Sequence, residues 1–138
     1  MPRFEKAIPV TTALILALAC RSDKPEDQAK KALSEAARAL EAGDTTGATE
    51  ILAPDFRMEG PEGDLDRVQL RFLFMGLLRQ GRPGITFLRV EGRVEGPVLR
   101  QEVDVLLSLA GEPNRRRWLL TWRKVDGAWK VARAQALE

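Results

Sequence analysis

The amino-acid sequence predicts an α+β domain in which helices come first and an antiparallel sheet follows. Up to about residue 80, apolar residues recur at helical spacing, whereas from residue 85 they alternate with polar residues as in strands. Turn signals rich in Gly and Pro divide this second part into segments of strand length. A run of helices followed by a run of strands is typical of the α+β class.

The first 19 residues have the pattern of a secretory signal peptide. Arg3 and Lys6 precede an uncharged, mostly apolar segment that runs from residue 7 to residue 19. This segment is shorter than the roughly 20 residues that cross a bilayer as a helix. We therefore predict that residues 1–19 are removed and do not form a transmembrane anchor.

The end of this segment, Leu16-Ala17-Leu18-Ala19-Cys20, resembles the lipobox of bacterial lipoproteins. The resemblance implies that Cys20 is acylated and attaches the mature chain to a membrane, with residues 20–25 as a short tether. Arg21 resembles the signal for the periplasmic side of the outer membrane if the host is Gram-negative. The alternative is a plain secretory signal cleaved near Ala19, which leaves a free thiol.

Two helices are expected after the tether. Pro25 suits the first turn of a helix, Glu26 and Asp27 suit its positive end, and Gly43 ends it. The residues that begin at Asp44 can cap a second, short helix, and this helix ends before Pro54. The predicted buried face of the first helix comprises Ala29, Ala32, Leu33, Ala36, Ala37 and Leu40.

A brief strand, a turn and a third helix are predicted next. Residues 56–59 have strand character, residues 60–63 form a turn, and the third helix begins at Asp64. This helix has almost no polar face, so we expect it to be buried on most sides until residues 81–84 break it.

Four strands complete the domain. The alternating segments cover residues 85–95, 98–110, 115–125 and 128–137, and the Asp126-Gly127 pair is a strong hairpin signal. We predict that they form an antiparallel meander.

Composition limits the chemistry that this chain can perform. The 138 residues suffice for one domain with its own core, and they include one Cys, no His and no Tyr. The usual zinc sites and imidazole-dependent nucleophiles therefore lack their residues. We predict no metal and no cofactor.

Net charge argues against nucleic-acid binding. Removal of residues 1–19 takes two basic residues and one acidic residue from totals of 22 and 20, so the mature chain is nearly neutral. Nucleic-acid binding needs a concentrated basic face. The one basic cluster, residues 115–117, is expected to be a solvated shoulder of a hairpin or, alternatively, to attract anionic head groups.

Three short motifs occur in a characteristic order: Ala42-Gly43-Asp44, Leu52-Ala-Pro-Asp-Phe56 and Val125-Asp-Gly-Ala-Trp-Lys-Val131. With the predicted elements, they resemble the nuclear transport factor 2-like superfamily, which includes SnoaL-like polyketide cyclases and ketosteroid isomerases. The resemblance implies that residues 26–138 form a cone-like, cystatin-like roll. In such a roll the sheet wraps around the N-terminal helices and leaves a pocket at the open end.

The same resemblance implies that the chain is not an enzyme. The positions of the isomerases' two proton donors and general base match Ala36, Leu119 and Gly60, and loss of such groups costs orders of magnitude in rate. The Asp–His pair of several cyclases lacks its histidine. The alternative is a SnoaL-like enzyme that uses a buried carboxylate, for which Asp55, Glu59, Glu62 and Glu102 are the candidates.

The resemblance also assigns the faces of the sheet. The alanines of the last strand point into the pocket, which implies a small apolar cavity; the alternative is a filled core. The predicted lining comprises Phe56, Met58, Phe72, Phe74, Leu119, Thr121, Ala132, Ala134 and Ala136.

Aromatic residues would then lie on the outer face of the sheet. Exposed, they would form an interface between two copies, because large aromatic side chains anchor protein interfaces. The alternative is that the faces are reversed and these residues belong to the core. The predicted dimer face comprises Trp118, Leu120, Trp122 and Trp129.

Together these observations predict an extracytoplasmic, lipid-anchored domain that acts without catalysis. Its expected partners are the membrane, through acylated Cys20, and either a small apolar ligand or a protein at the cell envelope. A structural dimerisation module is the further alternative.

Overall fold

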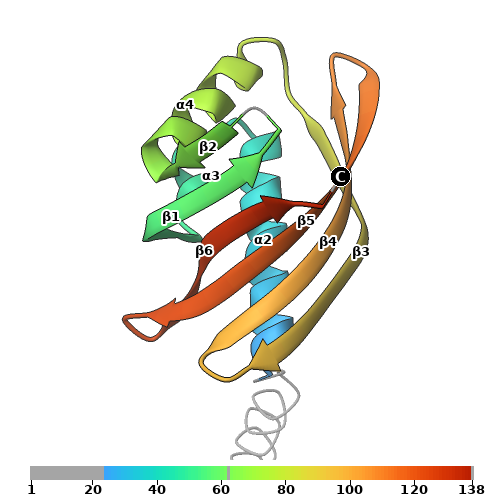
Figure 1. The fold of residues 1–138 in the computed structure, drawn as a ribbon. Helices are drawn as coiled ribbons and strands as arrows, with labels where there is room; N and C mark the ends of the chain where they lie inside the picture. Colours follow the sequence, from blue (N-terminus) through green and yellow to red (C-terminus); the bar gives the residue numbers. More distant parts are fainter. Residues whose placement is uncertain (1–23, 62, 138) are drawn as a thin grey trace, which may run out of the picture.

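The computed structural model describes residues 24–61 and 63–137. Nine elements form one layer of helices against one sheet (Figure 1). In chain order they are α2 (Pro25–Glu41), α3 (Thr45–Thr49), β1 (Leu52–Gly60), β2 (Gly63–Asp66), α4 (Arg67–Leu78), β3 (Gly84–Glu95), β4 (Val98–Leu109), β5 (Glu112–Val125) and β6 (Ala128–Ala136).

The six strands form one curved sheet in the order β2-β1-β6-β5-β4-β3. All neighbours are antiparallel except β1 and β6, which run parallel. The predicted α+β class and the four-stranded meander are confirmed. The predicted signal peptide and Cys20 lie outside the described residues, and no helix within the described ranges is long and apolar enough to span a membrane.

Helix α2 lies across the concave side of the sheet (Figure 1). It begins at Pro25, as predicted, and its small side chains allow close packing on the sheet. Gly43 follows the helix with φ +84°, and the Arg82 guanidinium occupies the space that a side chain at Gly43 would need. At its C-terminal end, Arg38 donates to the carbonyl of Ile85 (3.2 Å), and Glu41 accepts from the N–H of Ile85 (2.8 Å).

Helix α4 differs from the sequence prediction in two respects. It begins at Arg67 and not at Asp64, because residues 63–66 pair with β1 as strand β2. Asp66 forms a capping box with Gln69, in which each side chain accepts from the other residue's backbone N–H at 2.8 Å. The helix is also not buried on most sides, because it covers the end of the core with Leu70 and leaves its opposite face in solvent.

We expect Asp66→Ala to lower the free energy of unfolding by about 1 kcal/mol, because it removes the acceptor that caps α4. Asp64→Ala is the matched control: Asp64 is exposed in β2, so its loss is expected to stay within about 0.5 kcal/mol. Urea unfolding of both variants measures the difference. Equal losses, or a larger loss for Asp64→Ala, would contradict the capping role of Asp66.

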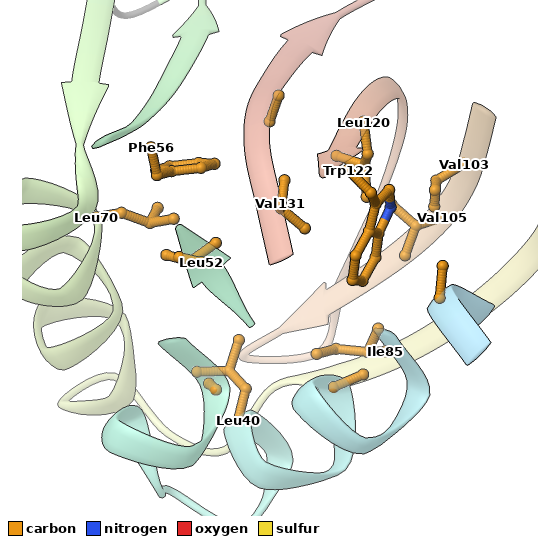
Figure 2. Close-up of a cluster of buried hydrophobic side chains, with 14 of the residues drawn as sticks. Leu40, Leu52, Phe56, Leu70, Ile85, Val103, Val105, Leu120, Trp122 and Val131 are labelled. Carbon is orange, nitrogen blue, oxygen red and sulfur yellow. The ribbon is translucent and has the colours of Figure 1, made fainter. Parts of the chain in front are cut away.

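The core lies between α2, α3, α4 and the concave face of the sheet (Figure 2). Trp122 is fully buried, and its indole Nε1 donates to the Oε1 of Gln101, itself fully buried, at 2.9 Å. Phe56 lies beside Leu70 of α4, and Val131 lies between Phe56 and Trp122. The interior is therefore a packed core in which one polar pair is embedded.

The strand faces are reversed relative to the predicted dimer face. Trp122 and Leu120 belong to the core, and Trp118 and Trp129 pack against it. The register explains the error: Leu120 pairs with Ala134, and Trp118 pairs with Ala136, so the tryptophans and these alanines share the inner face. A register shift between Thr121 and Trp122 makes Ala132 an extra residue and interrupts the alternation along β6.

Candidate functional site

The residues predicted to line a pocket do not enclose one. Phe56 and Ala134 are part of the packed core, and Met58 and Phe74 pack against it. Leu119 and Thr121 lie on the outer face, opposite Glu102 and Arg100, and not inside.

Phe72 is also misplaced by the prediction, because it is 65% exposed on the outer side of α4. Ala132 is the extra residue of the β6 bulge, and Ala136 faces Trp118. The expected apolar cavity is thus replaced by side chains of the core.

A groove of about 470 Å³ instead lies between α2, the end of α3 with the two residues after it, and the β5–β6 hairpin. Its floor is apolar, with Ala32, Ala36 and Ile51 beside the Trp129 ring. The Nε1 of Trp129 is buried and has no hydrogen-bond partner, and the ammonium of Lys124 lies 5.5 Å from the ring centroid. One wall of this groove thus holds an unused donor.

The three positions matched to catalytic residues do not converge. Ala36 lines the groove, whereas Leu119 lies on the opposite, outer face of the sheet. Gly60 ends β1 and pairs with Gly63 across the turn. These positions are therefore not parts of one site in this chain.

The candidate catalytic carboxylates are exposed or paired. The Arg123 guanidinium donates to both oxygens of Asp55 (2.6 and 3.0 Å), and this hydrogen bonding holds the pKa of Asp55 below its usual value. Arg133 donates to Glu59 at 2.6 and 3.0 Å, and Glu102 is exposed. A lowered pKa keeps Asp55 ionised, the opposite of what a general acid near neutral pH needs.

The remaining candidate, Glu62, lies outside the described residues. In the part of the chain that the structure describes, no three acidic or cysteine side chains form a group that could hold a metal ion.

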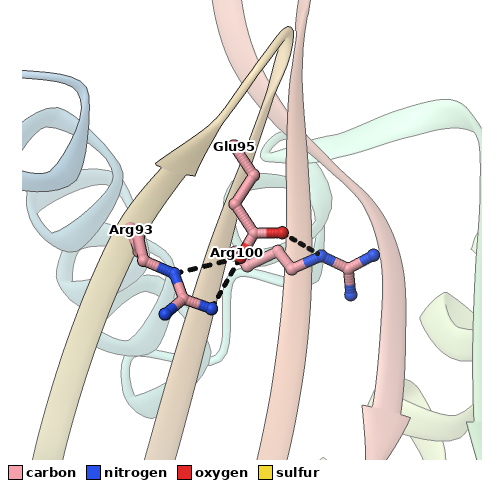
Figure 3. A network of polar contacts seen from close by, with 3 residues as sticks. All are labelled: Arg93, Glu95 and Arg100. Carbon is pink, nitrogen blue, oxygen red and sulfur yellow. Dashed lines mark hydrogen bonds and ion pairs between the residues drawn. The ribbon is translucent and has the colours of Figure 1, made fainter.

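The outer face of the sheet carries alternating charges and not aromatic residues. Glu95 accepts from Arg93 (2.8 Å) and from Arg100 (3.1 Å), as Figure 3 shows. Further along, Arg115 of the predicted basic triplet binds Asp104, and this contact lowers the pKa of Asp104. A shallow hollow of about 790 Å³ lies on this face beside Leu119.

The most distinctive surface is the exposed side of α4, which we call the α4 face. Its four large apolar side chains are 41–65% exposed, and Gly76 beside them leaves open space. Arg67, Arg71 and Arg79 lie on this helix or directly after it, and residues 67–79 contain no acidic residue. The α4 face comprises Val68, Phe72, Leu73 and Met75.

Sequence reasoning missed the α4 face because it treated an apolar helix as a buried one. A signal was present in the positions of Arg67, Arg71 and Arg79, which flank the apolar residues at helical spacing. An apolar helix with arginines along its length is as consistent with an exposed binding surface as with burial.

Comparison with known proteins finds similarity at the level of the fold. No family model and no curated protein sequence matches this chain. A protein of unknown function from Nostoc punctiforme with a cystatin-like fold superposes with a TM-score of 0.69 at 15% identity, over 83% of this chain and 91% of its own.

Two NTF2-like proteins are similarly close. The one from Cytophaga hutchinsonii has a TM-score of 0.71 at 15% identity and covers 82% of this chain and 97% of its own. The one from Pseudomonas putida, of unknown function, has a TM-score of 0.72 at 11% identity and covers 83% and 87%. The chain therefore has the nuclear transport factor 2-like, or cystatin-like, fold that the motifs predicted.

Proposed function

We propose that this chain is a membrane-anchored, extracytoplasmic domain that acts without catalysis and holds a protein partner through the α4 face. The observation that carries the proposal is the exposure of four large apolar side chains on one side of one helix. Contiguous apolar surface of this kind typically marks a site of interaction.

The chemistry of the α4 face defines the partner. Phe, Met and Arg are enriched in protein interfaces, and an amphipathic helix binds by inserting its apolar side into a groove. The three arginines of α4 and its C-terminal end, Arg67, Arg71 and Arg79, favour a groove bordered by carboxylates. The partner is therefore an acidic protein surface with an apolar groove.

The position of α4 indicates that the α4 face binds a protein and not the membrane in which the lipid anchor is inserted. Helix α4 lies at the end of the domain away from Pro25 (Figure 1), and the 17 residues of α2 span about 25 Å. The predicted tether from Cys20 to Pro25 reaches at most about 17 Å. A domain that stands on this tether would present the α4 face away from the bilayer.

The absence of catalysis remains a prediction that the carboxylates support. An enzyme of the SnoaL-like kind would need a buried acid with a raised pKa. Asp55 instead has a lowered pKa in its ion pair with Arg123, and Glu59 is bound to Arg133 in solvent.

A second candidate function is the binding of a small ligand in the groove beside Trp129. The unused Nε1 donor of Trp129 favours a ligand that has a hydrogen-bond acceptor and an apolar body. The groove is less favoured than the α4 face because it is open, and half of its lining residues are alanine or glycine.

The α4 face is tested by a photo-crosslinking side chain at position 72 of the full chain in host membranes. We expect a crosslink to one acidic envelope protein. That protein, once purified, should bind the wild-type chain, and its Kd should rise at least about tenfold with Phe72→Glu. Leu88→Glu is the control, because Leu88 is a half-exposed apolar residue outside the α4 face.

Two results would contradict the α4 assignment. One is an affinity for the crosslinked protein that Phe72→Glu leaves unchanged. The other is binding of the chain to phosphatidylglycerol vesicles that is lost with Phe72→Glu, which would make the surface a membrane-binding one.

The anchor is tested separately by the intact mass of the membrane-extracted chain. Acylation predicts a polypeptide that begins at Cys20 and carries the added mass of its acyl groups. We expect at least two acyl groups, because one alone gives only marginal membrane attachment. A Cys20→Ser variant should leave the membrane fraction. An unmodified thiol on a secreted chain would overturn the anchoring proposal.

A further inference from the structure

We propose that a second copy of this chain pairs with the free edge of β3 and joins two sheets about a two-fold axis that passes midway between the two Gly92 residues. Strand β3 is the last strand of the sheet, and no strand of the described ranges pairs with its other side. Gly92 and Val94 are exposed, and the whole strand is 12 residues long. Long, uncovered edges are templates for pairing with another chain.

The geometry of the β3–β4 hairpin determines which backbone N–H and C=O groups of β3 point away from β4. Glu95 and Val98 close a two-residue loop, so they form a hydrogen-bonded pair. In an antiparallel ladder such pairs alternate, so every second residue back from Glu95 bonds to β4. The N–H and C=O groups of Val90, Gly92 and Val94 therefore point to the free edge.

The other end of the edge is already occupied. Glu41 accepts from the N–H of Ile85, and Arg38 donates to the carbonyl of Ile85, which satisfies the outward groups of that residue. A register shift at Leu88 follows. Pairing is thereby confined to residues 89–95, which we call the β3 edge.

The charges of the β3 edge are complementary to themselves. Arg89, Glu91, Arg93 and Glu95 lie on one face and alternate in sign. An antiparallel copy centred on Gly92 places Arg89 opposite Glu95, and Glu91 opposite Arg93, in both directions. A shift of the centre to residue 91 or 93 would place like charges opposite each other, which is unfavourable.

These pairs would extend ion pairs that the single chain already forms. Arg93 and Glu95 are bonded along the strand, and Arg100 on β4 also binds Glu95 (Figure 3). Charged side chains on an edge, lysine above all, commonly oppose pairing. The β3 edge carries equal numbers of arginine and glutamate, so in this one register each charge of one copy meets the opposite charge of the other.

The inner face of the edge is complementary as well. Val90 packs against the core, whereas Val94 is 43% exposed beyond the start of α2. The proposed register places Val94 of each copy opposite Val90 of the other. Helix α2 starts above Gly92, where Glu26 lies, and runs back toward Ile85. The two α2 helices therefore extend away from the axis in opposite directions.

The dimer is compatible with the proposed lipid anchor. Only the placement of both copies on one membrane depends on that anchor. A two-fold axis perpendicular to the joined sheet keeps both α2 helices on the same face. Both helix starts lie near Gly92, so both tethers leave close to the axis and on one side. Two acylated copies could therefore attach to one membrane.

The pairing is tested by disulfide formation in the full chain in its membrane. Paired Cα atoms in a hydrogen-bonded antiparallel pair lie about 5.5 Å apart, within disulfide range. A Cβ atom at Gly92 would make only ordinary contacts, at 3.5 Å or more, so the backbone leaves room for the first atom of a side chain there. We expect Gly92→Cys to form a crosslinked dimer on oxidation, and the wild-type chain to form none.

Glu91→Cys is the matched control for the register. Residues 91 of the two copies are diagonal neighbours, about 7–8 Å apart, which is too far for a disulfide. Absence of the crosslink at 92, or equal crosslinking at 91 and 92, would overturn the proposed pairing.

Charge reversal supplies a second test. Glu91→Arg should lower the yield of the Gly92→Cys dimer about tenfold, because it puts Arg opposite Arg twice. Addition of Arg93→Glu to this variant should restore the yield, because residues 91 and 93 of the two copies again carry opposite charges. Glu102→Arg on β4 is the control and should leave the yield unchanged. A yield that Glu91→Arg does not alter would overturn the charge pairing.

Two measurements test whether the pairing of β3 edges is independent of the α4 face and whether it occurs without the introduced cysteine. Phe72→Glu should leave the Gly92→Cys crosslink unchanged. Sedimentation of the detergent-extracted chain without any substitution at 92 should show a dimer that Glu91→Arg dissociates; a monomer at every concentration would overturn the pairing.

Discussion

Trp122→Ala is expected to lower the free energy of unfolding by about 3–5 kcal/mol. Trp122 has no exposed surface and lies beside Leu120 and Val105 in Figure 2. Its removal leaves a large cavity between the sheet and α2. It also leaves the Oε1 of Gln101 without its donor, in a residue whose Nε2 already has no partner.

Urea unfolding of Trp122→Ala and Trp118→Ala measures this effect. Trp118 is the matched control, because it occupies the same strand face but is only partly buried at the edge of the core. We expect a clearly smaller loss for Trp118→Ala. A loss below about 1 kcal/mol for Trp122→Ala would mean that the residue is exposed, as the predicted dimer face requires.

Phe56→Ala is expected to cost a similar amount, about 3–5 kcal/mol, because Phe56 is 1% exposed between β1 and α4. The size of the loss reports whether the interior is filled. An open apolar pocket would already lack contacts on one side of the ring, so truncation would remove fewer of them.

The matched control is Phe72→Ala, which is the same substitution at another residue of the predicted pocket lining. Phe72 is 65% exposed, so its truncation should change stability by no more than about 0.5 kcal/mol. Thermal unfolding of the two variants separates them. Equal losses would contradict the placement of Phe72 on the α4 face.

The order and type of most elements could be predicted because their signals are local. Pro25 starts α2, Gly43 follows its end, and the Asp126-Gly127 pair marks the last hairpin. Turn residues and periodicity act over a few residues, so they can be recognised without knowledge of the rest of the chain.

The start of α4 could not be predicted, because its signal was ambiguous. Asp64 and Asp66 are both good capping residues, and only the pairing of Asp64 with Glu59 on β1 makes it part of a strand. That pairing depends on the turn at residues 60–63 closing a hairpin.

The strand faces could not be predicted either, for a related reason. The alternation in β6 predicts which residues share a face but not which face is inside, and the extra residue Ala132 changes the phase midway. One residue of register moves every following side chain to the other face. This single shift explains why the predicted dimer face is core and why Leu119 is outside.

By itself, the sequence determined the α+β class, the elements of the meander, the absence of histidine chemistry and the resemblance that the fold comparison bears out. These depend on residue types and short spacings. Only the tertiary structure decided that the interior is filled, that α4 is exposed on one side and that β3 presents a free, charged edge. Those features depend on which elements cover one another, and that is settled by long-range contacts such as Phe56 against Leu70 and Trp122 against Gln101.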